Sequence, residues 1–130
     1  MFNILRPLIF KFSPEVAHSL AIKALKLNNI PYSKPKDNHI LETTFCEKKL
    51  SSPIGVAAGF DKNAEVYNPL FNLGFGFVEV GTITPKPQFG NPKPRVFRLE
   101  EDEALINRLG FNNSGSEQIS QTIKENNKKG

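Results

Sequence analysis

Apolar residues recur with a helical period in the first part of the chain and in short, dense runs in the middle. Residues 14–27 carry valine, alanine and leucine on one stripe with lysines off it, which predicts an amphipathic helix. Ser13 and Pro14 come directly before the stripe, as an N-cap and a first helical residue typically do. Residues 1–12 are mostly apolar and predict a shorter helix, in which Pro7 lies in the first turn or bends the element. The two helices should form a hairpin.

The middle of the chain predicts a strand, a helix and a second strand. An apolar run over residues 54–58 stops at Gly59, residues 64–73 have a helical pattern that stops at Gly74, and residues 75–81 form another apolar run. Strand, helix and strand within about thirty residues predict a right-handed parallel β-α-β unit. The remaining segments predict a linker over 28–38, two short strands over 39–45 and 48–50, a strand over 96–99, an acidic turn over 100–103 and a last helix over 116–128.

Two segments have an unusual composition. Residues 82–95 hold four prolines, which exclude a helix and a central strand and predict a stiff, ordered loop. Residues 107–115 hold three asparagines, one arginine and two glycines. Because asparagine amides both donate and accept hydrogen bonds, this cluster suits a planar heterocycle that presents both kinds of group. The alternative is a glycine-rich turn before the last helix.

The first strand of the predicted β-α-β unit ends in a candidate binding site. Ala57, Ala58 and Gly59 have almost no side chain, so a flat ligand could lie on the backbone and bind its N–H and C=O groups. Lys62 adds a cation at the carboxyl end of the strand, where α/β proteins bind ligands. The alternative is a glycine turn followed by a solvated lysine.

Composition and charge narrow the functional classes. The chain has 130 residues with 17 basic and 13 acidic side chains, and lacks basic runs or motifs typical of nucleic-acid binding. Cys46 is the only cysteine, so the sequence predicts neither a disulfide nor a metal site built on cysteine. The N-terminal helices carry more apolar surface than they can bury against each other. This surface predicts either contact with a membrane interface or packing on a neighbouring domain.

Five motifs across residues 54–115 together resemble those of one enzyme family. They are AAGFDK at 57–62, GFGFVEVGT at 74–82, TPKPQ at 84–88, NPKPRVFR at 91–98 and NRLGFN at 107–112. In order and spacing they are similar to dihydroorotate dehydrogenase of class 2, the quinone-dependent branch. The N-terminal helix pair resembles the membrane-associated extension that separates class 2 from the soluble class 1 enzymes.

The resemblance implies an α/β fold, a TIM (β/α)8 barrel of which this chain holds only the first portion, preceded by an N-terminal α-helical hairpin. Residues 1–37 would form the membrane and quinone-tunnel extension with its linker, and residues 38–130 the first part of the FMN-binding barrel. The family oxidises dihydroorotate to orotate in pyrimidine (UMP) biosynthesis, using FMN and passing electrons to a membrane quinone. The implied location is peripheral on a membrane, at the cytoplasmic face of the inner membrane if the protein is bacterial.

The resemblance also implies roles for individual residues. The implied FMN contacts are Ala58, Gly59, Phe60, Asp61, Lys62 and Thr82. The implied substrate contacts are Lys62, Asn107, Arg108, Leu109, Gly110 and Phe111. The implied quinone-site residues are His18 and Arg98, although for His18 an ordinary surface histidine is the alternative. The family's catalytic serine lies in a loop beyond residue 130, so no catalytic base is expected within this chain.

A complete barrel needs about 250 residues, and this chain holds about two strand-helix units of it. We therefore expect a fragment that is inactive alone, and unstable or aggregated through its open strand edge. A cooperative unfolding transition of the isolated monomer would contradict that expectation. Two rival functions remain. Another FMN-dependent TIM-barrel oxidoreductase should lack the Asn107 segment in combination with the helical extension, and a non-catalytic membrane-binding chain should bind liposomes through residues 1–29 without retaining flavin.

Overall fold

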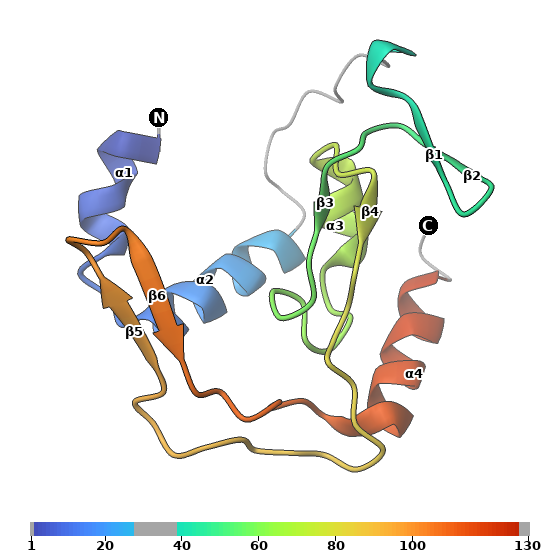
Figure 1. The fold of residues 1–130 in the computed structure, drawn as a ribbon. Coiled ribbons are helices and arrows are strands. Elements are labelled where there is room, and N and C mark those ends of the chain that lie inside the picture. Colours follow the sequence, from blue (N-terminus) through green and yellow to red (C-terminus); the bar gives the residue numbers. More distant parts are fainter. Residues whose placement is uncertain (1, 28–38, 128–130) are drawn as a thin grey trace.

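The structure is a computed structural model that describes residues 2–27 and 39–127, so the predicted linker over 28–38 lies outside the described residues (Figure 1). Three two-stranded sheets and four α-helices make up the described part, which gives an α/β architecture. The elements are α1 (Phe2–Ile9), α2 (Pro14–Lys26), a 3-10 turn (His39–Leu41), β1 (Thr43–Phe45), β2 (Lys48–Leu50), β3 (Gly55–Val56), α3 (Tyr67–Asn72), β4 (Phe77–Val78), β5 (Val96–Leu99), β6 (Ala104–Asn107) and α4 (Gly115–Asn127).

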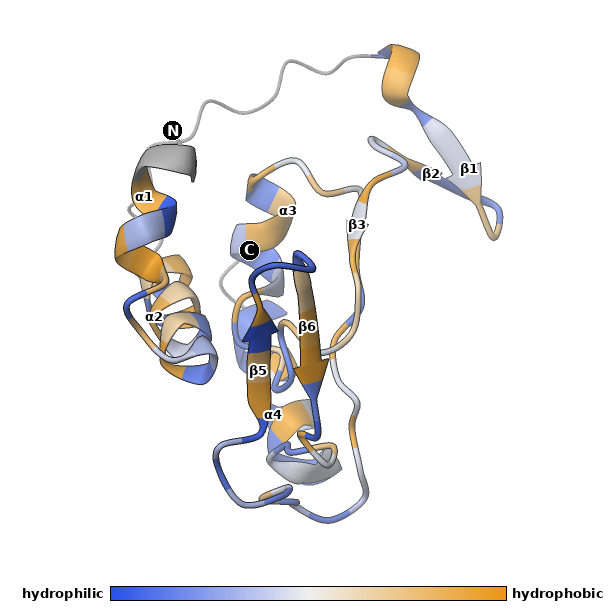
Figure 2. Ribbon diagram, turned by 60° about the vertical axis from the view of Figure 1, so that its left-hand side comes forward, coloured by the Kyte–Doolittle hydropathy of each residue, from blue (hydrophilic) through white to orange (hydrophobic). Residues whose placement is uncertain are grey.

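Both predicted N-terminal helices are confirmed. α2 starts at Pro14 after Ser13, whose carbonyl accepts the backbone N–H of Ala17 at 2.9 Å, while its hydroxyl makes no capping bond. Pro7 lies inside α1. Figure 2 shows hydrophobic residues along both helices, and the side chains of Leu8 and Val16 are 56% and 46% exposed. The pair therefore leaves apolar surface uncovered by the described residues, as the sequence predicts.

The main core joins α2 to α3. Ile22 and Leu25 of α2 pack with Val66 and Leu70, and partly buried apolar side chains surround these four residues. Burying one such side chain contributes about 1.5–3 kcal/mol. The N-terminal hairpin is therefore held against the β3-α3-β4 unit by a shared apolar core.

The β-α-β unit forms with a parallel sheet, but its elements are shorter than predicted. β3 and β4 pair over two residues each, so the strand predicted over 75–81 is confirmed only at Phe77–Val78. The helix start predicted at Ala64 is wrong, since α3 begins at Tyr67. The Asp61 carboxylate accepts the backbone N–H groups of Glu65 and Val66, both at 2.8 Å, and holds this stretch in a turn with Ala64 at φ 56°.

The other strands partly match the sequence analysis. β5 pairs in antiparallel register with β6, from Val96 opposite Asn107 to Leu99 opposite Ala104, and β6 is not predicted. The strand predicted over 39–45 is wrong in its first part, which forms the 3-10 turn, whereas β2 and the acidic turn between β5 and β6 agree. α4 begins one residue before its predicted start and is described as far as Asn127.

The proline-rich loop is ordered by a second irregular segment. Gln88 and Asn113 exchange two backbone hydrogen bonds at 2.9 and 3.0 Å, and Asn91 N–H donates to the carbonyl of Leu109 at 3.0 Å. The two segments run together between the β3–β4 sheet and the β5–β6 hairpin (Figure 1). The predicted stiff loop is confirmed, and it fixes residues 107–113 beside the ends of β3 and β4.

Candidate functional site

A cavity of about 390 Å³ lies where β3 and β4 end. Its size is within the range of small-molecule sites, about 300–1,000 Å³. Three segments that are distant in sequence line it. They contribute Ala58, Gly59, Lys62, Gly81, Thr82, Asn91, Asn107, Arg108, Leu109, Gly110, Phe111 and Asn112. The cavity thus brings four of the residues with an implied cofactor role together with all five of the implied substrate segment.

The backbone at the strand ends is open on one side. Gly59 has φ +105°, and a Cβ built on it would meet nothing within 4 Å. Its N–H donates to the carbonyl of Gly81 at 2.8 Å, and Gly81 N–H donates to the carbonyl of Asp61 at 3.0 Å. These bonds fix the two strand ends relative to each other. A planar ligand can therefore approach the peptide backbone at Gly59 closely.

Lys62 is a half-buried cation beside this open backbone. Its Nζ donates to the carbonyl of Gly59 at 2.6 Å. Burial lowers the pKa of Lys62 from its ordinary value of 10.5, Glu15 and Asp61 oppose that shift, and Arg95 adds to it. The ammonium has lost part of its hydration, so an electron-rich oxygen at this position would be bound more strongly than at an exposed lysine.

The lowered pKa of Lys62 determines how its contribution to stability changes with pH. Between that pKa and 10.5 the unfolded chain binds more protons at this residue than the folded chain does. The contribution of Lys62 to stability therefore rises with pH across this alkaline window and is constant below it.

The side chains of Phe60 and Asp61 point away from the cavity at the strand ends, which the other four residues with an implied cofactor role line. Asp61 is 1% exposed and accepts the two N–H groups of the turn before α3. Phe60 packs at the edge of the apolar core. Neither residue lines the smaller cavity, and both line a second one.

This second cavity, of about 520 Å³, separates α2 from the β5–β6 hairpin. His18 and Arg98 line it together with Lys62, Asn107 and Leu109. The two cavities share five lining residues, which are Gly59, Lys62, Asn107, Leu109 and Asn112. The residues implied for the quinone site therefore lie next to those implied for cofactor and substrate.

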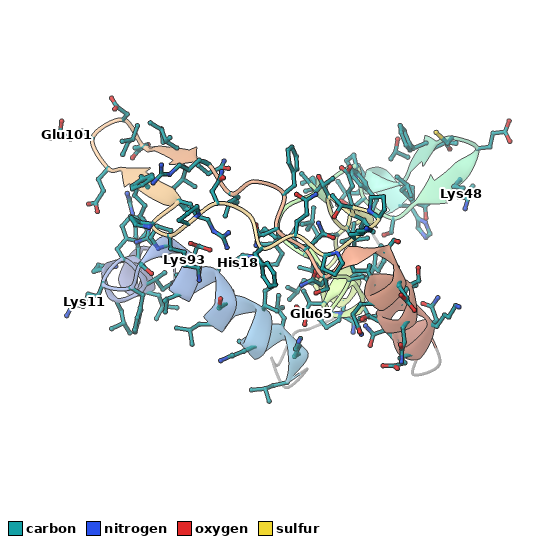
Figure 3. All side chains as sticks on the ribbon, turned by 90° about the horizontal axis from the view of Figure 1, so that it is seen from below. Lys11, His18, Lys48, Glu65, Lys93 and Glu101 are labelled. Carbon is teal, nitrogen blue, oxygen red and sulfur yellow. The ribbon has the colours of Figure 1, made fainter. Side chains whose placement is uncertain are left out.

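His18 is attached to the turn after β3. Its Nε2–H donates to the carbonyl of Phe60 at 2.7 Å, and the two rings meet edge to face with centroids 5.4 Å apart. In Figure 3 His18 lies near the centre of the molecule, whereas Lys11, Lys48 and Glu101 lie at its periphery. His18 is thus a half-buried link between α2 and the turn after β3, and not a freely solvated histidine.

Arg98 of β5 binds the segment between α1 and α2. Its Nη1 donates to the carbonyl of Phe12 at 2.8 Å and more weakly to that of Phe10 at 3.4 Å. The guanidinium carbon lies 4.5 Å from the centroid of the Phe10 ring, a cation-π geometry. Arg98 therefore connects the β5–β6 hairpin to the N-terminal helices while lining the larger cavity.

Asn112 belongs to the asparagine cluster of the sequence analysis, which gives it no individual role. Its Oδ1 is buried and has no hydrogen-bond partner among the described residues, although Asn112 lines both cavities. A buried acceptor without a partner costs about 1–3 kcal/mol, so a ligand that donates an N–H here would be bound favourably. The signal in the sequence is the pair of adjacent asparagines at 112 and 113, because only the second of them is used by the protein itself, bonding Thr84.

A hollow of about 770 Å³ lies between the proline-rich loop and α4, and Asn112 and Asn113 are among the residues that line it. In residues 2–27 and 39–127, no group of three or more His, Cys, Asp or Glu side chains is arranged to hold a metal ion.

Comparison with known proteins identifies the family. The family model for dihydroorotate dehydrogenase matches residues 40–130. The dihydroorotate dehydrogenase (quinone) of Erythrobacter litoralis is 49% identical over all 130 residues, which cover 38% of that protein. The corresponding protein of Rhodospirillum rubrum is 55% identical over 111 residues, 85% of this chain and 30% of that protein.

Solved structures agree with these matches. The crystal structure of DHODH from Eimeria tenella in complex with ferulenol matches with a TM-score of 0.81 and 46% identity, covering 87% of this chain and 30% of that chain. The ligand-free form from the same organism gives a TM-score of 0.82. The chain spans about a third of the length of these relatives. Since both the sequence match and the shared fold extend over most of its residues, the chain belongs to the dihydroorotate dehydrogenase family.

Proposed function

We propose that this chain acts as the N-terminal part of a quinone-dependent dihydroorotate dehydrogenase built on a TIM barrel, which oxidises dihydroorotate to orotate in UMP biosynthesis. The observation that carries the proposal is the pair of adjoining cavities. One collects the residues implied for cofactor and substrate, the other collects those implied for quinone, and five residues line both. This arrangement suits an enzyme in which a reductant and an oxidant are bound on either side of one redox group.

The smaller cavity fits the ring system of FMN. The open backbone at Gly59 accommodates a flat ring, the buried Oδ1 of Asn112 accepts an N–H, and Lys62 interacts with ring oxygens. A flavin presents both N–H and C=O groups on one edge, so its N–H would match the acceptor of Asn112 and its C=O groups would match the cation of Lys62. Bound FMN would supply the hydride acceptor and the route by which electrons leave.

The chain's own residues would then bind and orient the substrate. Lys62 would hold electron-rich oxygens and stabilise the negative charge that a bound flavin gains when it accepts hydride. The Asn107 amide can both donate to and accept from the pyrimidine amide edge. Gly110 at φ +75° and Phe111 at φ 54° form the turn that lets the ring approach this segment. The catalytic serine implied by the resemblance lies beyond residue 130.

The larger cavity would take the quinone head group. Arg98 can donate hydrogen bonds to a quinone oxygen and His18 lies across the cavity on α2, with Val96 and Leu105 adding apolar walls. The exposed apolar side chains of α1 and α2 would lie in the membrane interface, so that quinone enters from the lipid. None of the helices in the described ranges is long and apolar enough to cross a membrane. The exposed apolar side chains of α1 and α2 support the proposed peripheral location, at the cytoplasmic face of the inner membrane if the protein is bacterial.

The proposal is tested by a graft in which residues 1–130 replace the matching segment of the Erythrobacter litoralis relative. The grafted protein should retain FMN after purification and should reduce a soluble quinone in the presence of dihydroorotate. Asn107→Ala should raise the KM for dihydroorotate by about 10- to 100-fold, because it removes hydrogen bonds to the substrate. Lys48→Ala, on the distant β1–β2 hairpin, is the matched control and should not change it (Figure 3).

Other outcomes would favour the rival functions. A folded graft that retains FMN but oxidises another substrate instead of dihydroorotate would indicate a different FMN-dependent oxidoreductase. A graft that binds liposomes through the N-terminal helices and retains no flavin would indicate a non-catalytic membrane-binding chain.

A further inference from the structure

Arg95 is a buried cation that the proposed reaction does not use directly. Its side chain is 7% exposed. Its Nε and Nη2 donate to Oε1 of Glu15 at 3.1 and 3.0 Å, across 80 residues of sequence. Glu15 lies in the first turn of α2. The pair therefore ties the N-terminal hairpin to the residue that precedes β5.

The remaining guanidinium nitrogen of Arg95 binds the two irregular segments. Nη1 donates to the carbonyls of Phe89 at 2.7 Å and Asn91 at 3.0 Å, with a longer contact of 3.5 Å to that of Leu109. The Arg95 carbonyl in turn accepts the backbone N–H of Arg108 at 2.8 Å. One side chain thus contacts α2, the proline-rich loop and the segment that lines both cavities.

The packing around this guanidinium leaves no spare room. A Cβ on Gly90 would lie 2.1 Å from the carbonyl oxygen of Leu109 and 2.6 Å from Nη1 of Arg95. The loop can approach the segment this closely only because residue 90 is a glycine, here at φ +75°. The backbone position of Leu109 is therefore set by Arg95 and by the loop that Arg95 holds.

We propose that Arg95 is a positioning residue for dihydroorotate binding, which holds residues 107–112 against Lys62, and that Glu15 of the N-terminal hairpin fixes Arg95 in place. This inference rests on the proposed function. A lysine at position 95 would keep the charge but could not reach the carboxylate and the carbonyls at once. An uncharged side chain at position 15 would leave a buried guanidinium without its counter-ion.

The same pair connects the two cavities. Glu15 and His18 lie one turn apart on α2 and both line the larger cavity, whereas Leu109 lines both cavities. Glu15 and Arg95 also act in opposite directions on the pKa of Lys62, so both charges are close enough to influence it. A change at the start of α2 should therefore affect the dihydroorotate side of the site.

The test compares Arg95→Lys and Glu15→Gln in the graft, with Lys93→Ala as the matched control. Lys93 Nζ lies 3.9 Å from the same Glu15 oxygen, but its side chain is 69% exposed, so its loss should have little effect. Arg95→Lys and Glu15→Gln should raise the KM for dihydroorotate by about tenfold. The double variant should raise the KM for dihydroorotate no further than Arg95→Lys alone does, since both changes break the same contact between Glu15 and Arg95.

Amide hydrogen exchange gives a readout independent of activity. The N–H of Asn91, which donates to Leu109, should exchange about tenfold faster in both variants, whereas that of Glu79, which donates to Val56, should not change. Glu15→Asp keeps the charge on a shorter side chain and should restore part of the protection. It also replaces Glu15→Gln in the comparison if that variant does not fold.

Two results would overturn the inference. Either the KM for dihydroorotate and the exchange of Asn91 stay within twofold of the parent graft in both variants, or Asn91 and Glu79 lose protection equally, as a purely structural role requires. An inactive parent graft would instead count against the proposed function. The difference in Asn91 exchange between parent and variants would still decide whether Arg95 positions the segment.

Discussion

Lys62→Met is expected to lower kcat/KM for dihydroorotate in the graft by about 10²- to 10³-fold. Lys62 is the half-buried cation that lines both cavities, and its Nζ lies 2.6 Å from the carbonyl of Gly59. Methionine keeps much of the apolar stem and removes the charge, so packing changes little while stabilisation of developing negative charge is lost. Steady-state kinetics at fixed quinone, together with the FMN content of the purified protein, measure the effect.

The control for Lys62→Met is Lys48→Met, at an exposed site on β2, which should leave kcat/KM unchanged. A loss smaller than threefold in Lys62→Met would show that Lys62 has no part in the reaction. The same variant checks the direction of the pKa shift. Because the pKa of Lys62 is lowered, its replacement should reduce the rise in stability with pH in the alkaline window below 10.5.

Asp61→Ala is expected to destabilise the graft by about 3 kcal/mol. The carboxylate is 1% exposed and accepts two backbone N–H groups at 2.8 Å each, and hydrogen bonds to a charged acceptor contribute about 1.5–3 kcal/mol. Alanine leaves both donors without a partner in a buried turn. Urea unfolding of the variant and the parent measures the difference.

Asp61→Asn provides a graded comparison, because its amide keeps one acceptor oxygen and should lose about half as much stability as alanine. Asp102→Ala, on the exposed acidic turn, is the control and should change stability by less than about 0.5 kcal/mol. A loss below 1 kcal/mol in Asp61→Ala would mean that water replaces the carboxylate and that the turn before α3 does not depend on it.

Elements defined by neighbouring residues are predicted well from the sequence. α2 starts at Pro14 because a cap position and a proline act locally, whereas β3 ends at Val56, earlier than the predicted stop at Gly59. α3 starts later than predicted because its first turn depends on the carboxylate of Asp61, which side-chain periodicity does not report. β6 is not predicted because its apolar run is short and its strand character comes from pairing with β5.

The candidate site also has parts that the sequence predicts and parts that it does not. The resemblance names the segments that the structure brings together around the smaller cavity, since each motif is continuous in sequence. Glu15 and Arg95 receive no role from the sequence, because their importance comes from a contact between distant parts of the chain, and Asn112 is identified only as a member of the asparagine cluster. The bond between Glu15 and Arg95 joins residues 80 positions apart, and no local pattern marks it.

The apolar core shared by α2 and α3 determines what the protein would lose if its N-terminal helices were removed. Ile22 and Leu25 complete a core whose other members, Val66 and Leu70, follow the turn after β3. Deleting the N-terminal helices would therefore remove half of one apolar core and would not separate two independent modules. Without the N-terminal helices the apolar side chains at 66 and 70 would lose their partners and Arg95 would lose Glu15, so a stable shortened chain is expected to need substitutions at these three positions.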